Sequence, residues 1–255
     1  MKACPVALAV LVAVAPLSSP AAETAEAWIT KARAYLGTES ALNAVTSIHY
    51  FGTLETPDET PVTEDKGKPA AVTRLPAEIV VQKPYQQRIM LTKDDAVEIR
   101  ALDGYDGWIK STSVQTPKQW RFRLLEGQEI KQLRANTWDN LNFFSGLEKK
   151  GGAVQLGDEA VVDGVPCIKL SFVYAENITF LRFFDRATGR LVRTKTENGG
   201  EIREEGEIMA GGIRFPRKII NKSASGQVTV LVIDRVVLNE RFPDNEFAVP
   251  TLLEN

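Results

Sequence analysis

Few side chains in this 255-residue sequence are of types that carry out catalysis or bind metals. His49 is the only histidine, and the two cysteines are Cys4 and Cys167. One histidine cannot build a multi-histidine metal site. His49 could act as a lone base, but no serine or cysteine with the setting of a nucleophile lies near it in the sequence. We therefore interpret His49 as a strand residue on a half-exposed face.

The cysteines and a pair of aspartates allow equally little chemistry. Cys167 lies within an apolar strand pattern, which favours a buried, inert thiol over a reactive one. Cys4 precedes most of an apolar run, whereas a lipidated cysteine follows such a run. Asp103 and Asp106 around Gly104 resemble part of a calcium loop, but no further ligand follows at the required spacing, and turn chemistry explains them. We expect no catalytic residues, no metal and no cofactor, and hence no enzyme.

The overall composition is that of a folded globular protein, with 44% hydrophobic and 25% charged residues. Lysine and arginine total 31 and aspartate and glutamate total 33, which gives a formal net charge of −2. A protein that binds nucleic acid through phosphate contacts needs an excess of positive charge. The charge balance therefore argues against a nucleic-acid partner.

The N-terminus has the pattern of a secretory signal peptide. A basic start at Lys2 is followed by an apolar stretch from Ala3 to Leu17 and then by small residues up to Ala22. The apolar stretch is shorter than the roughly 20 residues that cross a bilayer, which disfavours a retained membrane anchor. We expect residues 1–21 to be the signal peptide, residues 22–255 to be a single domain, and the protein to be periplasmic.

The elements that would position a site begin with two short helices. Apolar spacing and capping residues predict helices over about 24–37 and 38–45, followed by a strand over 47–55. Residues 56–76 contain four prolines among many charges and predict a long loop, either a mobile flap over a binding site or a solvated loop. Alternating segments from residue 77 onward predict further strands joined by hairpin turns.

The longest helical signal follows, from Ile130 to the glycine pair at 151–152. Lys149 and Lys150 would suit the C-terminal end of this helix. Trp138 and Phe143 stand off its main apolar stripe, so the helix carries large apolar groups on more than one side. It could be packed into the core, or it could be a lid whose second apolar side faces a ligand cavity.

The last hundred residues predict an antiparallel meander with regularly spaced turn signals. The segment from Glu201 to Glu207 is largely polar, and we expect one of its faces to be solvated. Two other segments, Ile178–Phe184 and Val228–Leu238, are apolar on both parities. A sheet with one wet face does not have this pattern, so either helices cover both faces or one face lines an apolar cavity.

Several of these segments resemble the outer-membrane lipoprotein-sorting (LolA/LolB-like) superfamily, in an order that spans most of the chain after the signal peptide. They are Tyr35-Leu36-Gly37, Ala41–Val45, Ile48–Glu55, Val162–Cys167, Phe184–Val192, Gly212–Ile219, Val237-Leu238-Asn239, Pro243-Asp244 and Phe247–Pro250.

The resemblance implies an α+β fold, an antiparallel half-open β-barrel made by a strongly curved sheet, with helices covering the concave face. It also implies a periplasmic carrier that holds acyl chains of a lipid or lipoprotein in an apolar cavity and works with a partner protein of the inner or outer membrane. The alternative is an envelope sensor or assembly module that uses the same half-barrel to bind a peptide or protein. From the parity of strands and helix we expect the cavity to be lined by Ile89, Leu91, Ile99, Trp108, Trp138, Phe143, Phe144, Leu170, Phe172 and Phe180.

Overall fold

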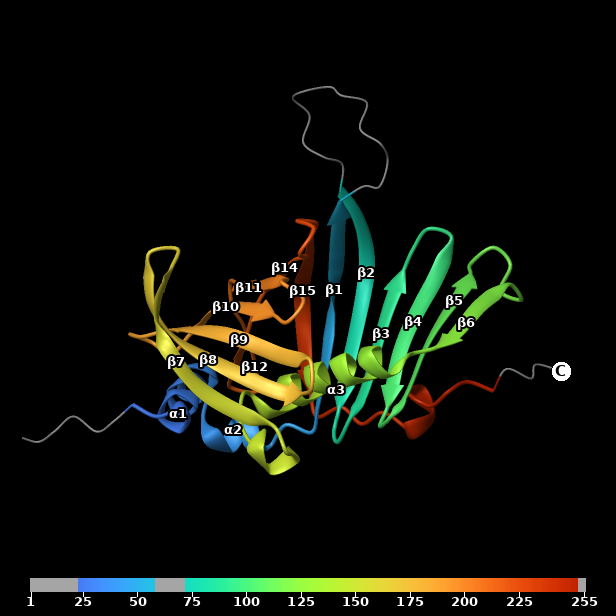
Figure 1. The fold of residues 1–255 in the computed structure, drawn as a ribbon. Coiled ribbons are helices and arrows are strands. Elements are labelled where there is room, and N and C mark those ends of the chain that lie inside the picture. The colour runs from blue at the N-terminus through green and yellow to red at the C-terminus, as the bar shows by residue number, and fades with distance from the viewer. Residues whose placement is uncertain (1–22, 58–71, 252–255) are drawn as a thin grey trace, which may run out of the picture.

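A single strongly curved antiparallel sheet of 13 strands dominates the structure, a computed structural model that describes residues 23–57 and 72–251. The strand order is β6-β5-β4-β3-β2-β1-β15-β14-β11-β10-β9-β8-β7. The edge strands β6 and β7 do not pair with each other, so the sheet stays open, and the helix α3 crosses its concave side (Figure 1). This is the half-open barrel that the sequence predicts.

The elements have the following bounds. The helices are α1 (Ala25–Leu36), α2 (Glu39–Asn43) and α3 (Gly127–Asn142), with short 3₁₀ turns at Glu148–Lys150 and Asp244–Glu246. The first six strands are β1 (Ser47–Pro57), β2 (Val72–Gln82), β3 (Gln86–Thr92), β4 (Ala96–Asp103), β5 (Asp106–Ser113) and β6 (Trp120–Leu124). The later strands of the large sheet are β7 (Ala153–Val162), β8 (Val165–Ala175), β9 (Ile178–Asp185), β10 (Leu191–Thr196), β11 (Glu201–Glu205), β14 (Lys218–Lys222) and β15 (Val228–Leu238). A separate hairpin is formed by β12 (Ile208–Ala210) and β13 (Ile213–Phe215).

The two N-terminal helices begin where their capping residues predict. The hydroxyl of Thr24 accepts a hydrogen bond from the backbone N–H of Ala27 at 3.1 Å, and Thr38 caps α2 through Ala41 at 3.2 Å. These hydroxyls satisfy backbone donors that the first turn of a helix leaves free. Among the described residues, no helix combines the length and the apolar character needed to cross a bilayer.

The helix α3 connects the two halves of the sheet. Its buried residues Leu133, Ala135 and Leu141 belong to three different hydrophobic clusters, one against β4 and β5, one against β8 and β9, and one against β1 and β15. This explains why large apolar groups occur on more than one side of the helix in the sequence.

The predicted C-terminal end of this helix is wrong, because α3 stops at Asn142 rather than at the glycine pair 151–152. Phe143 and Phe144 have φ angles of 48° and 71°, in the left-handed region, where a helix cannot continue. The cation at this helix end is Arg33 of α1. Its buried guanidinium donates to the carbonyl oxygens of Asn142 and Phe143 at 2.8 and 2.9 Å.

The predicted loop over 56–76 is also partly wrong, because β1 continues to Pro57 and β2 begins at Val72. Pro76 lies within β2, opposite Thr53 of β1. Pairing of β2 with β3 begins only at Ala77, so the missing N–H of Pro76 can face an unpaired edge. The remainder of that loop, 58–71, and the predicted signal peptide lie outside the described residues.

The strand β15 has apolar residues at both odd and even positions because it contains a β-bulge. Phe51 lies opposite Arg235, but the next residue, Gly52, lies opposite Ile233, so one residue of β15 is left over at Asp234. The extra residue reverses the parity of the strand. Ile233 and Val236 therefore both pack into the same cluster.

The strand β9, in contrast, is buried on both of its faces. Phe180 and Phe184 pack on the concave side, beneath α3. Leu181 and Phe183 pack on the other side, in a cluster with the buried Cys167. Burial raises the pKa of the Cys167 thiol, which agrees with the predicted inert cysteine.

His49 is buried, with 5% exposure, which corrects the expected half-exposed position. The chain after β15 packs back over this outer face, where Phe242 contacts the imidazole ring edge-on. The ring nitrogens lie 2.7 Å from a carboxylate oxygen of Glu240 and 3.1 Å from one of Glu78. His49 therefore ties the C-terminal segment to the outside of the sheet.

Candidate ligand-binding cavity

Two adjoining cavities lie on the concave side of the sheet. The first, which we call the inner cavity, has a volume of ≈ 260 Å³ and lies between α3 and the strands β1, β9, β10, β11 and β14. The second, the outer cavity, has a volume of ≈ 470 Å³ and extends to α1 and the β12–β13 hairpin. Both are lined by Leu36, Phe144, Leu191, Glu204, Arg214, Phe215 and Pro216. Sites for small ligands typically have volumes of about 300–1,000 Å³, so the pair is large enough to take one.

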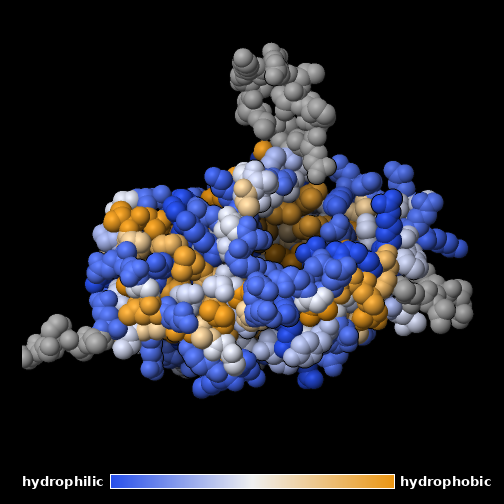
Figure 2. All heavy atoms as spheres, in the orientation of Figure 1, coloured by the Kyte–Doolittle hydropathy of each residue, from blue (hydrophilic) through white to orange (hydrophobic). Residues whose placement is uncertain are grey.

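A more open apolar surface continues from the inner cavity along the same face. Residues that lie opposite one another across the strands share a face. By this register the surface, which we call the groove, consists of the half-buried side chains Leu54, Leu75, Ile89, Leu91, Ile219 and Leu231. Figure 2 shows a hollow with a hydrophobic floor in front of β1 and β2. Ile219 belongs to both the groove and the inner cavity, so the two are continuous.

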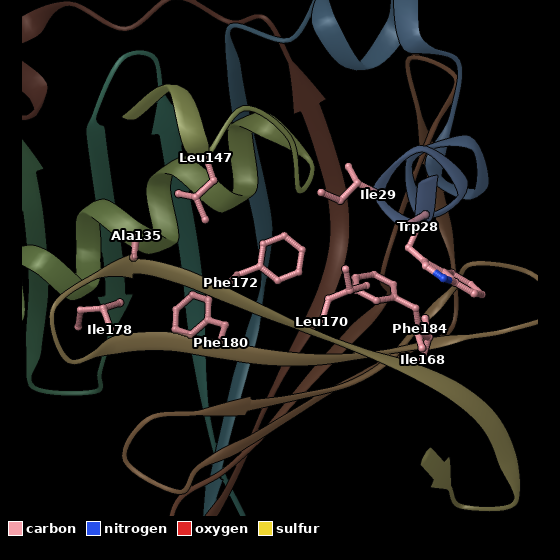
Figure 3. Packing of buried hydrophobic residues seen from close by; sticks show 11 residues of the cluster. Trp28, Ile29, Ala135, Leu147, Ile168, Leu170, Phe172, Ile178, Phe180 and Phe184 are labelled. Carbon is pink, nitrogen blue, oxygen red and sulfur yellow. The ribbon is translucent and has the colours of Figure 1, made fainter. Parts of the chain in front are cut away.

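Aromatic side chains cluster beside the inner cavity on the β8–β9 side, where Phe144 and Phe180 line it. The rings of Phe172 and Phe184 lie 6.4 Å apart, and the ring of Phe144 meets that of Phe184 edge-on at 5.3 Å. Figure 3 shows Phe172, Phe180 and Phe184 gathered between these strands and α3. The left-handed backbone at Phe144 ends the helix, and this residue lines both cavities.

The structure places three of the ten predicted lining residues on the inner cavity and two more in the hydrophobic cluster beside it. Phe143, Phe144 and Phe180 line it directly, while Leu170 and Phe172 are fully buried in the packed layer of β8. Ile89 and Leu91 lie in the groove. These seven residues thus share the concave side of the molecule.

The other three predicted lining residues lie elsewhere. Trp138 lines a separate cavity of ≈ 430 Å³ on another side of α3, where its ring stacks on Tyr85 at 5.9 Å. Ile99 and Trp108 lie on the outer face of the sheet. They alternate along their strands with Leu102 and Ile109, which pack against α3, and the Trp108 indole donates to the carbonyl oxygen of Phe247 at 2.9 Å.

A buried polar cluster, which we did not predict from the sequence, lies within this apolar surface. Arg182 of β9 is 2% exposed and forms an ion pair of 2.6 Å with Asp139 of α3. The hydroxyl of Tyr174 donates to the other carboxylate oxygen of Asp139 at 2.7 Å and accepts from Arg182 at 3.0 Å. The guanidinium also lies over the rings of Phe172 and Phe180, at 4.5 and 5.3 Å. Asp139 and Tyr174 thus bind two edges of a cation that aromatic faces enclose.

Glu204 is the second polar feature of the cavity and lies on the concave face of a segment for which the sequence predicted one solvated face. It is half-buried and lines both cavities. Burial, together with the nearby Asp139, raises the pKa of the Glu204 carboxyl to about 7. Burial also raises the pKa of Tyr50 and of Tyr174, so both phenols stay neutral. Burial lowers the pKa of Arg182, but Asp139, Tyr174 and Glu204 together outweigh this effect and the net shift of the pKa is upward, so Arg182 stays charged.

The sequence contained a signal for one of these residues. Arg182 interrupts the apolar segment Ile178–Phe184 and shares a strand face with Phe180 and Phe184. A charge on such an apolar face is buried and therefore needs a partner of opposite charge. Glu204 carried no such signal, because Glu201, Arg203 and Glu205 surround it.

Within the described ranges, no group of three or more histidine, cysteine, aspartate or glutamate side chains is placed to hold a metal ion. His49 and Cys167 both lie outside the two cavities, on the outer face. The described residues of the two cavities therefore combine apolar side chains with the buried Arg182–Asp139 ion pair and with the carboxyl groups of Glu204, Glu205 and Glu207.

Comparison with solved structures identifies the fold. A LolA superfamily protein from Nitrosomonas europaea is 17% identical and matches with a TM-score of 0.58, over 89% of this chain and 99% of that chain. A domain assigned to outer membrane lipoprotein-sorting proteins, from Vibrio parahaemolyticus, is 8% identical and matches with a TM-score of 0.55 over 88% and 97%. A DUF1329 family protein from Desulfovibrio piger is 10% identical and also matches with a TM-score of 0.55 over 88% and 97%.

No protein-family model and no curated protein sequence matches the chain. The structural matches cover most of the chain, and they confirm the resemblance at the level of the fold: the protein has the LolA-like fold.

Proposed function

We propose that this protein is a periplasmic carrier that binds the acyl chains of a lipid or lipoprotein in the inner cavity and the groove. The observation that carries the proposal is the continuous apolar surface on the concave side, from Phe180 in the inner cavity to Leu91 in the groove. An ordinary one-layer core would be covered by helices, whereas α3 leaves this surface partly open (Figures 1 and 2). The LolA-like fold supports the same reading.

Burial of an acyl chain supplies enough free energy for such a function. Each buried methylene contributes about 0.8 kcal/mol, so about ten methylenes contribute about 8 kcal/mol. That is the free energy of a micromolar complex, before the costs of association are subtracted. A carrier needs affinity of this order, because it must release its cargo as well as bind it.

The location and the partners belong to the same proposal. The signal-peptide pattern of residues 1–21 supports export to the periplasm. A soluble carrier between two membranes would receive its cargo from, or deliver it to, a protein of the inner or outer membrane. The proposal includes no catalytic step, and the polar groups of the cavity are assigned to binding.

Native mass spectrometry of the protein purified after export tests this function. We expect a bound species whose extra mass equals that of a lipid and which is lost after extraction with organic solvent. The same preparation offered a mixed lipid extract should regain the mass. A consistently empty protein that takes up no lipid would contradict the proposal and would favour a module that binds a peptide or protein on the same face.

A further inference from the structure

A cavity that plays no part in the proposed function lies on the far side of α3. This cavity, which we call the basic cavity, contains Trp138 and has a volume of ≈ 430 Å³, within the range of sites for small ligands. Spacings of four place Ile130, Arg134 and Trp138 on the helix face that lines it. Asn136 and Asn140, which line the inner cavity, lie on the opposite face of the helix. The helix therefore separates the two cavities.

The basic cavity carries positive charge without a balancing negative charge. Lys131 and Arg134, neighbours on the surface of α3, line it together with Lys150 of the 3₁₀ turn. No acidic side chain of the described residues lines it. None of the three cations forms an ion pair within the described part of the chain. A concave surface with charge of one sign attracts a ligand of the opposite sign.

The guanidinium of Arg134 is held in place while one of its edges stays free. Its central carbon lies between the rings of Tyr85 and Tyr105, at 3.9 and 3.8 Å from their centroids. Its Nη1 donates to the carbonyl oxygen of Gly104 at 2.6 Å. Its Nε and Nη2 donate to no described residue and reach solvent, since neither is a buried unsatisfied atom. Binding at this edge therefore needs little further ordering of the side chain.

Flat aromatic faces form much of the remaining wall. The ring of Trp138 stacks on that of Tyr85 at 5.9 Å with an angle of 28° between the planes, and Lys150 Nζ lies 5.7 Å from the centre of the Trp138 ring. Aromatic rings prefer to stack on other rings at such distances. The groove, in contrast, is lined by leucine and isoleucine side chains. The basic cavity therefore suits a flat ring better than a flexible acyl chain.

We propose that the basic cavity is a second binding site, which takes a small aromatic compound carrying a carboxylate or phosphate group. The Nε and Nη2 edge of Arg134 presents two parallel N–H donors, which match two oxygen atoms of either group. The aromatic body of the ligand stacks against the rings of the wall. Lys131 and Lys150 are exposed and contribute attraction of longer range. The site does not depend on the proposed function.

Three probes that share a naphthalene ring test this assignment. 2-Naphthoate and 2-naphthamide have nearly the same shape and differ in charge, while 2-naphthyl phosphate separates a phosphate ligand from a carboxylate ligand. Calorimetric titration at physiological ionic strength gives the dissociation constants. We expect both anions to bind at least tenfold more tightly than the amide, because hydrogen bonds between ionised groups are the stronger ones. The tighter of the two anions identifies the preferred group.

Variants of two adjacent lysines locate the bound anion. Lys149 and Lys150 are both exposed residues of the 3₁₀ turn, but only Lys150 lines the basic cavity. We expect Lys150→Gln to weaken naphthoate binding about threefold and Lys149→Gln to leave it unchanged. Arg134→Gln should weaken it at least tenfold and change the affinity for naphthamide less than twofold. Lys150→Gln alters only an exposed side chain, so it keeps the test valid if Arg134→Gln does not fold.

Several outcomes would overturn the second site. These are equal affinities for all three probes, no binding of either anion, and equal losses in Lys149→Gln and Lys150→Gln. A saturating fluorescent acyl probe should leave the affinity for naphthoate unchanged, because the inner cavity lies across α3. Displacement of one probe by the other would place naphthoate in the inner cavity, which would overturn the second site and leave the proposed function standing.

Discussion

The raised pKa of Glu204 makes the stability of the protein depend on pH in a defined direction. In the unfolded chain this carboxyl has an ordinary pKa of 4.5, and in the folded protein burial raises it to about 7. Between these values the folded state binds more protons than the unfolded state. Stability contributed by this group is therefore present at low pH and is lost as pH rises from about 4.5 to about 7.

The magnitude follows from the size of the shift. One pKa unit corresponds to about 1.4 kcal/mol, so the rise from 4.5 to about 7 corresponds to a loss of about 3 kcal/mol. Glu204→Gln removes the titration and keeps the shape of the side chain. We therefore expect the free energy of unfolding of the variant, minus that of the wild type, to increase by about 3 kcal/mol between pH 4.5 and pH 7.5.

The assay is denaturant unfolding of both proteins at several pH values in that window. Taking the difference between the two free energies of unfolding cancels the contributions of the other titrating groups. The exceptions are the groups that face Glu204, which are Tyr50, Asp139, Arg182 and Arg190. Glu197→Gln, which removes an exposed carboxylate, serves as the control and should give a flat difference. If the difference in free energy of unfolding between Glu204→Gln and the wild type stays constant or falls as pH rises, the burial of this carboxyl in the cavity is refuted.

Two further predictions concern the elements that shape the cavity. Arg33→Met removes the cation that caps the last turn of α3, so we expect a loss of about 3 kcal/mol in denaturant unfolding, with faster amide exchange confined to that turn. Equal exchange rates in both proteins would show that Arg33 does not hold the helix end. Gly52→Ala places a Cβ atom 2.0 Å from the carbonyl oxygen of Val232 at the β-bulge, so we expect the thermal midpoint to fall by several degrees. An unchanged midpoint would mean that the close approach of these strands is not required.

Much of the fold was predictable from local chemistry. Thr24 and Thr38 mark helix starts because their hydroxyls satisfy free N–H groups, and glycine–aspartate turns separate the strands of the meander. Local patterns fail where a distant residue decides the outcome. Arg33 caps a helix end more than a hundred positions away, and the segment around Phe242 buries His49, which local alternation alone assigns to a half-exposed face.

The candidate site was predictable only in part, because parity alone does not say which face of a strand is concave. Alternation correctly groups Phe172 with Phe180, but it cannot tell that Ile99 and Trp108 lie on the face away from α3. A β-bulge at Asp234 hides the true parity of β15. Glu204 reads as a surface residue because its neighbours in sequence are charged, and only the curvature of the sheet brings it into the cavity.

The central claim is that acyl chains occupy the inner cavity, and titration of a fluorescent acyl probe into a cavity-filling variant tests it most directly. Ile202 is a half-buried lining residue of the inner cavity, and Ile202→Trp adds bulk there without removing any packed core group. Val161→Trp, at a residue that is 73% exposed on the outer edge strand, is the matched control. We predict that Ile202→Trp weakens probe binding at least tenfold while Val161→Trp leaves it unchanged. Equal affinities for wild type and both variants would show that acyl chains do not bind in this cavity.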